Sequence, residues 1–332
     1  MQAPTRADYV RTYFTLFEYF QQERGQVAHP GHPFEYADQA LIVFFSLMMV
    51  RRLTAFKAQH RWLMQHLHEA LLLGFEQIPH RITLSRRYKT LYPTVQAFIA
   101  FVGRWAEALS LEFDSRVLIE DASLFKACGP VWHQTDRLAG RVPEKLRKLD
   151  QEASWRKSAY HGWVYGYSLH LTCNRSGFPK LAQVETASVA ESQVLEQKKE
   201  TLFALEPRAL VGDNAYFKAM RVRNWAAEGV ILLTPAVRWH NGRYAAAYHR
   251  FIAKTPFLDW LKCRKTAIEP MFDLFSKVLG TANNHKQLPL QWLTKVRPFL
   301  SLAVLAVQIA MIVNNAFGFP LRQISNFLTA FS

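Results

Sequence analysis

The chain has 332 residues, of which 50% are hydrophobic and 14% aromatic, and this composition excludes a disordered protein and predicts a globular one with two domains. Lysine and arginine number 41 against 26 acidic residues, a formal net charge of +15 at pH 7. Such a surplus favours a polyanionic partner, most commonly nucleic acid, although an anionic membrane surface would suit it too. Cys128, Cys173 and Cys263 lack zinc-site spacing and predict inert thiols in a reducing cytosol.

Residues 1 to about 112 are predicted to be helical. The first residues lack the continuous apolar run of a signal peptide. Aromatic and aliphatic side chains recur at helical spacing from Tyr9 to Phe20, and residues 54–75 fit a further helix. Near the other end of the chain, residues 299–313 form an apolar run that is short for a membrane span and is interrupted by Gln308. We interpret it as a core helix.

A short segment of the N-terminal region is strongly basic. Its charged side chains are Arg81, Arg86, Arg87 and Lys89. Ser85 is expected to cap a short helix that ends before Pro93. A basic helix joined by a turn to earlier helices suits a helix-turn-helix reader of DNA. A solvated basic surface is the alternative.

From about residue 113 the pattern changes to strands alternating with helices. Strands are expected at residues 116–125, with an apolar run at 117–119, and at 162–174, 180–190, 208–217 and 230–237, and helices at 194–205 and 219–229. The result is an α/β fold with a mixed five-stranded sheet. Trp155, Arg156, Lys157 and His161 lie in a polar stretch that is either a plain loop or a segment that stacks on DNA ends.

Three acidic residues follow or begin predicted elements. Asp121 and Asp213 each follow an apolar strand, in "VLIED" and "ALVGD", so their carboxylates share one sheet edge if the strands are neighbours. Glu269 precedes Pro270, which places it at the start or kink of a helix. Glu120 should point to the opposite face from Asp121. Converging carboxylates suit Mg²⁺, and two such ions can promote phosphodiester cleavage. Each acid alone could equally be a cap or surface residue.

These motifs, together with "GYSLHL", "GDNAY" and "RKTAIEPMF", resemble the DDE transposases of bacterial insertion sequences over residues 113–315. The resemblance implies an RNase H-like fold in which Asp121, Asp213 and Glu269 are catalytic and bind two Mg²⁺ ions, for which Mn²⁺ can substitute. Many relatives carry Tyr-x2-Arg-x3-Glu-x6-Lys around the last acid. This chain departs from that motif, with Lys262, Lys265 and Ser276 at the three other positions and Lys277 one residue later.

The resemblance also implies an organisation and an activity. We expect a helical DNA-binding domain at 1–112, a catalytic domain at 113–318 with an insertion at about 238–262 and an apolar helix at about 292–315, and a tail at 319–332. The protein would bind terminal inverted repeats and catalyse strand cleavage and transfer, as a homodimer on DNA in the bacterial cytoplasm, associated with the nucleoid and not with a membrane. The expected DNA contacts are Arg81, Arg86, Arg87, Lys89, Arg264, Lys265 and Lys277. Alternatives are a DNA-binding protein that has lost catalysis and a metal-dependent nuclease.

Overall fold

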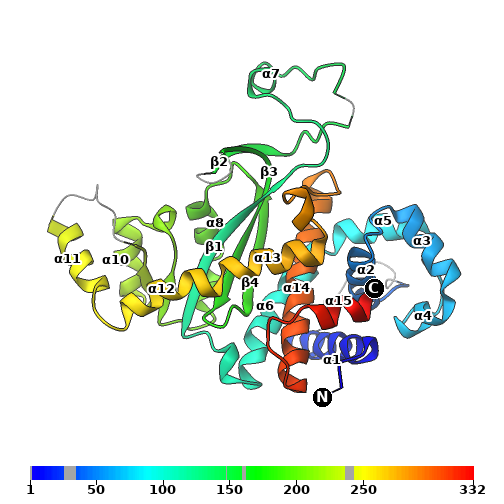
Figure 1. The fold of residues 1–332 in the computed structure, drawn as a ribbon, viewed down its shortest axis with the longest axis horizontal. Coiled ribbons are helices and arrows are strands. Elements are labelled where there is room, and N and C mark those ends of the chain that lie inside the picture. The colour runs from blue at the N-terminus through cyan, green and yellow to red at the C-terminus, as the bar shows by residue number, and fades with distance from the viewer. Residues whose placement is uncertain (1, 26–34, 147, 159–161, 236–242) are drawn as a thin grey trace.

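The computed structural model describes residues 2–25, 35–146, 148–158, 162–235 and 243–332 (Figure 1). Its N-terminal third is helical, as predicted. The helices are α1 (Arg6–Arg24), α2 (Asp38–Val50), α3 (Phe56–Gln65), α4 (Leu67–Leu72), α5 (Arg81–Thr90) and α6 (Tyr92–Trp105), followed by the short 3-10 helices η1 (Ala106–Ala108) and η2 (Leu111–Phe113).

The predicted cap of the basic helix is wrong. Ser85 lies inside α5, and the helix begins at Arg81 with the His80 side chain accepting a hydrogen bond from the Ile82 backbone N–H (3.4 Å). The earlier start lets Leu84 and Tyr88, four residues apart on one face, both enter the core. Burial of this apolar pair therefore outweighs the preference of serine for a cap.

The middle of the chain forms one mixed sheet. Its strands are β1 (Val117–Lys126), β2 (Ser154–Ser158), β3 (Gly162–Asn174), β4 (Pro179–Thr186), β5 (Ala209–Val211) and β6 (Ile231–Leu233). β3 pairs antiparallel with β1 on one side and with β2 and β4 on the other, whereas β1, β5 and β6 run parallel. This sheet with flanking helices confirms the predicted fold class. The strand β2 was not predicted, because its sequence is polar.

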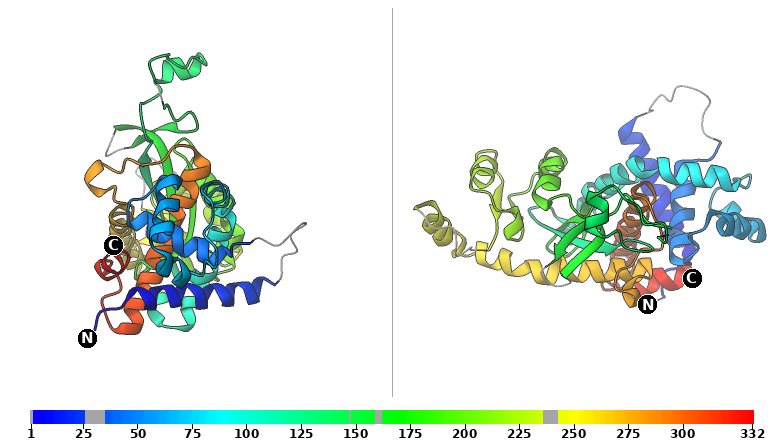
Figure 2. Two further views of the ribbon diagram at one scale, coloured as in Figure 1. Left: turned by 90° about the vertical axis from the view of Figure 1, so that its right-hand side faces the viewer. Right: turned by 90° about the horizontal axis from the view of Figure 1, so that it is seen from above.

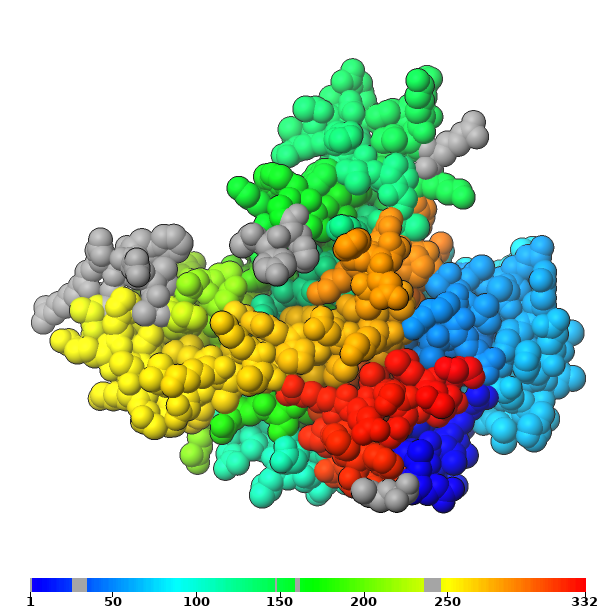
Figure 3. All heavy atoms as spheres, in the orientation of Figure 1, coloured from blue at the N-terminus to red at the C-terminus, as the bar shows by residue number. Residues whose placement is uncertain are grey.

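Helices cover both faces of the sheet (Figure 2). The remaining helices are α7 (Gln134–Leu138), α8 (Glu191–Gln197), α9 (Lys199–Phe203), η3 (Asn214–Tyr216), α10 (Ala219–Ala227), α11 (Arg243–Ile252), α12 (Phe257–Ala267), α13 (Glu269–Leu279), η4 (Ala282–Asn284), α14 (Leu293–Phe317) and α15 (Ser325–Phe331). The α7 segment projects from the body (Figure 3). The predicted insertion falls partly on residues 236–242, outside the described residues, and its described part begins with α11.

The apolar helix α14 lies at the centre of the molecule, as its predicted core role requires. Among the described residues it is the one helix long and apolar enough to cross a membrane, and 94% of its most apolar window is buried within the protein. It packs against α1, α2, α5, α6 and α13 and against strand β4. The buried Gln308 donates to the carbonyls of Ile99 in α6 (3.0 Å) and Pro179 in β4 (2.9 Å). The N-terminal helices and the sheet thus share one core.

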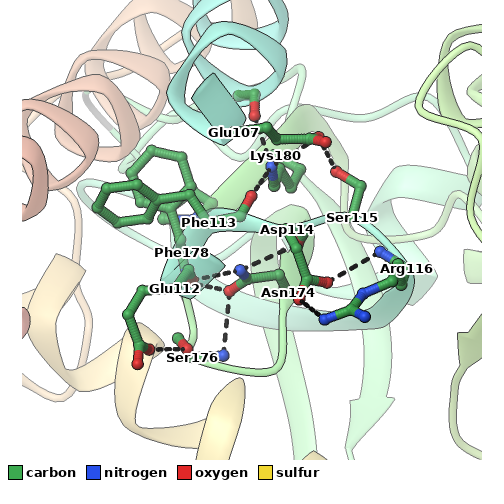
Figure 4. A network of polar contacts seen from close by, with 12 residues as sticks. Glu107, Glu112, Phe113, Asp114, Ser115, Arg116, Asn174, Ser176, Phe178 and Lys180 are labelled. Atoms are coloured by element: carbon green, nitrogen blue, oxygen red, sulfur yellow. Dashed lines mark hydrogen bonds and ion pairs between the residues drawn. The ribbon is translucent and has the colours of Figure 1, made fainter. Parts of the chain in front are cut away.

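A buried polar network reinforces this junction just before β1 (Figure 4). Lys180 of β4 is fully buried, and its ammonium donates to the Gly103 carbonyl (2.6 Å), to Glu107 (3.0 Å) and to the Phe113 carbonyl. Burial lowers the pKa of Lys180 to about 8, although the Glu107 carboxylate opposes that shift. Every donor of the ammonium is therefore used to tie β4 to the end of the helical region.

Candidate active site

Asp121 and Asp213 occupy equivalent places on two neighbouring parallel strands. β1 and β5 pair in parallel up to Ile119 opposite Val211, and each aspartate lies two residues beyond that pair. The prediction that both carboxylates share one sheet edge is confirmed. The predicted strand at residues 116–125 is confirmed as β1, which continues past Asp121 to Lys126 along its antiparallel partner β3.

The two adjacent acids of β1 point to opposite faces of the sheet, as predicted. Glu120 is fully buried and accepts hydrogen bonds from Lys198 (2.5 Å) and from Thr172 (2.5 Å) on the face covered by α8 and α9. Asp121 faces α12, where its Oδ2 accepts from the Arg264 guanidinium (2.6 Å) and its Oδ1 accepts from the Ala122 N–H (2.9 Å). Only Asp121 is therefore placed to line the candidate site.

The surroundings of Asp121 favour its neutral form. Burial raises the pKa of Asp121 to about 6, the Arg264 guanidinium opposes this shift, and the negative charges of Asp213 and Glu120 add to it. Asp213 caps η3, with its Oδ1 accepting from the Ala215 N–H (2.8 Å). The negative charge of Asp213 beside the buried Asp121 makes a cation favourable at this point.

Glu269 lies where the sequence predicted, at the junction of two helices. α12 ends at Ala267, and Glu269 is the first residue of α13 with Pro270 in its first turn. Its side chain is 51% exposed, and its Oε1 lies 3.8 Å from Arg264 Nη2. Since Arg264 also binds Asp121, one guanidinium spans these two acids. The carboxylate of Glu269 does not itself line the cavity described next.

A polar cavity of about 390 Å³ opens beside the two aspartates. Its charged lining is Asp121, Asp213, Glu191, Arg156, Lys157 and Lys286. Glu191 and Lys286 were missed by the sequence analysis, because each is far from both aspartates in the chain and no motif marks it. Arg156 and Lys157 belong to the polar stretch noted in the sequence, which forms strand β2. The cavity therefore combines three acids with three bases.

Glu191, at the start of α8, is held by Arg156 of β2. Arg156 donates to Glu191 Oε1 (2.5 Å) and to the Val189 carbonyl (3.1 Å). Glu191 Oε2 is buried and has no hydrogen-bond partner among the described residues. Burial raises the pKa of Glu191 to about 7, Arg156 opposes the shift, and the nearby Asp213 and Asp121 add to it. The negative charges at the cavity thus raise the pKa of Glu191 as well as that of Asp121.

The variant Glu191→Gln is expected to change how stability depends on pH. The pKa of Glu191 is raised from 4.5 to about 7 in the folded protein, so its contribution to stability is complete below about 4.5 and is lost as the pH rises through about 7. With 12% of the side chain exposed, solvent screening is small. Between about pH 4 and pH 8 the free energy of unfolding should fall by up to about 3 kcal/mol more in the wild type than in the variant. Urea unfolding across this range measures it, and parallel curves would contradict the expectation.

The carboxylate oxygens of Asp121 and Asp213 suit a hard divalent cation, although the acidic side chains do not form a complete set of metal ligands. Within the described ranges, no group of three or more His, Cys, Asp and Glu side chains is close enough to hold a metal ion. Asp121 and Asp213 share the cavity and offer carboxylate oxygens, the ligands that Mg²⁺ prefers. Asp121 and Asp213 are therefore the residues that would hold a divalent cation here.

The basic residues predicted for DNA contact fall into different surroundings. Arg81, Arg86 and Lys89 line a cavity of about 490 Å³ with Lys57, where α5 packs beside α3, and we call this surface the basic groove. Arg87 instead has a side chain only 6% exposed and forms an ion pair with Asp38. Arg87 lies on the buried face of α5, so its charge does not reach the basic groove that Arg81, Arg86 and Lys89 line.

The bases near Glu269 also differ in their surroundings. Lys265 and Lys277 are exposed, and neither lines the cavity beside the aspartates. Arg264 is only 21% exposed because it is engaged with Asp121 and Glu269.

Comparison with known proteins gives one family. Residues 112–270 match the family model described as the transposase DDE domain, and this segment contains Asp121, Asp213 and Glu269. A cryo-EM structure of the piggyBac transposase synaptic complex with hairpin DNA matches with 11% sequence identity and a TM-score of 0.41, covering 97% of this chain and 78% of that one. No curated protein matches the chain.

Proposed function

We propose that the chain is the transposase of a bacterial insertion sequence, with Asp121, Asp213 and Glu269 as its catalytic, metal-binding acids, because residues 112–270 match the family model of the transposase DDE domain. The observation that carries this proposal is the equivalent placement of Asp121 and Asp213, each two residues beyond the last parallel pair of β1 and β5 and both in one cavity. The contacts of Arg264 with both Glu269 and Asp121 support Glu269 as the third acid of this set.

The proposed reaction has two steps, and each of them breaks a phosphodiester bond of DNA. Hydrolysis of a phosphodiester at the element's end releases a 3′-hydroxyl, and that hydroxyl then attacks a phosphodiester of target DNA and displaces another 3′-oxygen. Two Mg²⁺ ions held by the three acids, or Mn²⁺ in their place, would activate the attacking oxygen and stabilise the leaving one. The chain itself supplies the fixed spacing of Asp121 and Asp213 and the cations Arg156 and Lys157 at the cavity, which suit the charge of the DNA backbone.

The basic groove is the proposed contact for the terminal inverted repeats. Arg81, Arg86 and Lys89 converge there, and none of the described residues in the groove's lining is acidic. We leave Arg87 out of this set, since it is committed to Asp38. Arg264, Lys265 and Lys277 remain proposed contacts nearer the cleaved end. Joining two ends requires two active sites, so we propose a homodimer on DNA that acts at the bacterial nucleoid.

The double variant Arg86→Gln/Lys89→Gln is expected to weaken DNA binding in a salt-dependent way. Removing one cation from a phosphate lowers the slope of log K against log salt by about 0.9, so the slope should fall by nearly 2. Fluorescence anisotropy with a duplex from the DNA that flanks the protein's own gene gives this slope. The control is Arg11→Gln/Arg24→Gln, which removes the same charge from the exposed side of α1. Equal slopes in both variants would mean that the groove has no special role.

The central test is a cleavage and joining assay. Purified protein is incubated with labelled duplexes that carry the flanking ends of its own gene, with a plasmid target and either Mg²⁺ or EDTA. Mg²⁺-dependent release of 3′-hydroxyl ends that then join the plasmid is the expected result. Cleavage without joining would favour a nuclease. Tight binding without cleavage in any metal would favour a DNA-binding protein, which the exposure of Glu269 outside the cavity would then explain.

A further inference from the structure

Lys286 enters the cavity of the aspartates from the connection between α13 and α14. His285 and Lys286 have backbone φ angles of 47° and 60°, two consecutive residues in the left-handed region that residues other than glycine rarely adopt. Such a conformation persists only where neighbouring contacts fix the backbone, and it is concentrated at functional sites. The connection is therefore shaped to hold Lys286 in one place.

Backbone hydrogen bonds join this connection to the strand that carries Asp121. The Lys286 N–H donates to the Thr281 carbonyl (3.0 Å), and the Lys286 carbonyl accepts from the Lys126 N–H (3.0 Å). The Leu288 N–H donates to the Lys126 carbonyl (2.9 Å), and Leu288 is buried. The last residue of β1 thus fixes the position of Lys286 relative to Asp121.

The ammonium of Lys286 lies in the cavity without a direct ion pair among the described residues. Burial lowers the pKa of Lys286, and the charges of Asp273 and Asp121 oppose that shift. Its Nζ donates to Ser123 Oγ (2.9 Å) and lies 5.9 and 5.8 Å from the ring centroids of Phe125 and Phe272. None of the described carboxylates forms an ion pair with it. An ammonium has three donors, so a single hydroxyl partner leaves it able to bind a further acceptor.

No residue of α13 after Glu269 supplies such a charge to the cavity. Ser276 is buried, and its hydroxyl donates to the Phe272 carbonyl of its own helix (2.8 Å). Lys277 is exposed and does not line the cavity. The positive charge on this side of the cavity therefore comes from Lys286.

We propose that Lys286 binds a non-bridging oxygen of a DNA phosphate seated in the cavity of Asp121 and Asp213. This inference rests on the proposed function and adds a substrate contact to it. A phosphodiester placed there would face carboxylates that hold cations on one side and the ammonium on the other. A compact ammonium at the end of a flexible stem suits a single phosphate oxygen. Ser123 orients the ammonium and is a positioning residue.

The first test is the salt dependence of DNA binding. The probe is a duplex from the gene's flanking DNA whose strand already ends at the 3′-hydroxyl, so that no further cleavage occurs. Lys286→Gln should lower the slope of log K against log salt by about 0.9, the change expected when one phosphate is no longer neutralised. Lys286→Arg should keep the slope, and so should Lys254→Gln, an exposed lysine outside the cavity lining.

The second test locates the phosphate. A set of duplexes carries one neutral methylphosphonate each, at successive positions around the cleavage site. On unmodified DNA, Lys286→Gln should cut about 10² to 10³ times more slowly than wild type, the usual effect of removing one donor from a reacting oxyanion. On one member of the set the two proteins should cut at the same rate, because the contact is absent in both. A purely structural defect would slow the variant equally on every member.

The outcomes separate this inference from the proposed function. If the wild type cuts DNA but Lys286→Gln binds with an unchanged slope, or is slowed equally on every duplex, the phosphate contact is overturned and the transposase proposal stands. If the wild type never cuts DNA but Lys286→Gln lowers the slope, the phosphate contact stands and the catalytic proposal fails. An unfolding curve matching the wild type confirms that each variant is folded.

Discussion

Asp213→Asn is expected to reduce DNA cleavage by about 10³-fold or more. Asparagine matches aspartate in size and caps a helix equally well, so the hydrogen bond from the Ala215 N–H to the side chain is kept. What disappears is the negative charge, and with it several kcal/mol of metal-dependent stabilisation of the transition state, at tenfold in rate for each 1.36 kcal/mol. The rate of 3′-end release in Mg²⁺, at saturating protein, measures the effect.

The matched control for this variant is Asp259→Asn. Asp259 lies in α12, its side chain is 59% exposed, and its contact with Lys262 is long at 3.9 Å. The control removes the same charge and should cut DNA at the wild-type rate. Unchanged cleavage by Asp213→Asn would remove Asp213 from the catalytic set and would also remove the main support for Asp121.

Glu120→Leu is expected to destabilise the fold by about 3–5 kcal/mol. Glu120 is fully buried, and the change leaves the ammonium of Lys198, itself only 6% exposed, without its charged partner. Burial raises the pKa of Glu120 and lowers that of Lys198, and each charge opposes the shift of the other. Removal of one charge therefore exposes the full desolvation cost of the second. Urea unfolding at neutral pH measures the destabilisation.

The triple variant Glu120→Leu/Thr172→Val/Lys198→Met is expected to recover most of that stability. It removes every polar member of the cluster at once, and replacing a buried ion pair by apolar groups is often neutral or stabilising. The triple variant should also cut DNA, since Asp121 points to the other face of the sheet. If the triple variant were less stable than Glu120→Leu alone, the Glu120–Lys198 ion pair would contribute more to stability than the desolvation of its two charges costs.

The parts of the site that follow strand periodicity were predictable from the sequence. The opposite directions of Glu120 and Asp121 follow from the two-residue repeat of a strand, and Pro270 marked the helix boundary at Glu269. Arg87 could have been assigned correctly as well. It lies three residues after Leu84 and next to Tyr88, which places it on the buried face of α5.

Other parts depend on contacts between distant segments. The predicted strand at residues 116–125 pairs with β3 beyond Asp121, as far as Lys126, and the sequence alone did not identify this partner. β2 pairs with the first half of β3, so its polar sequence forms a strand. Glu191 and Lys286 reach the cavity through the sheet order and through the connection after α13. Their roles are properties of the fold.

The central position of α14 has a geometric consequence for DNA. Since this helix packs against both α5 and β4, the helices of the basic groove and the sheet that carries Asp121 share one packed core. A duplex gripped at the groove would then present one fixed phosphate to Asp121 and Asp213. The distance between the groove and the aspartates would then set the position of the cut. Inserting or deleting base pairs between the bound sequence and the element's end would move the cut along the DNA by the same number of nucleotides.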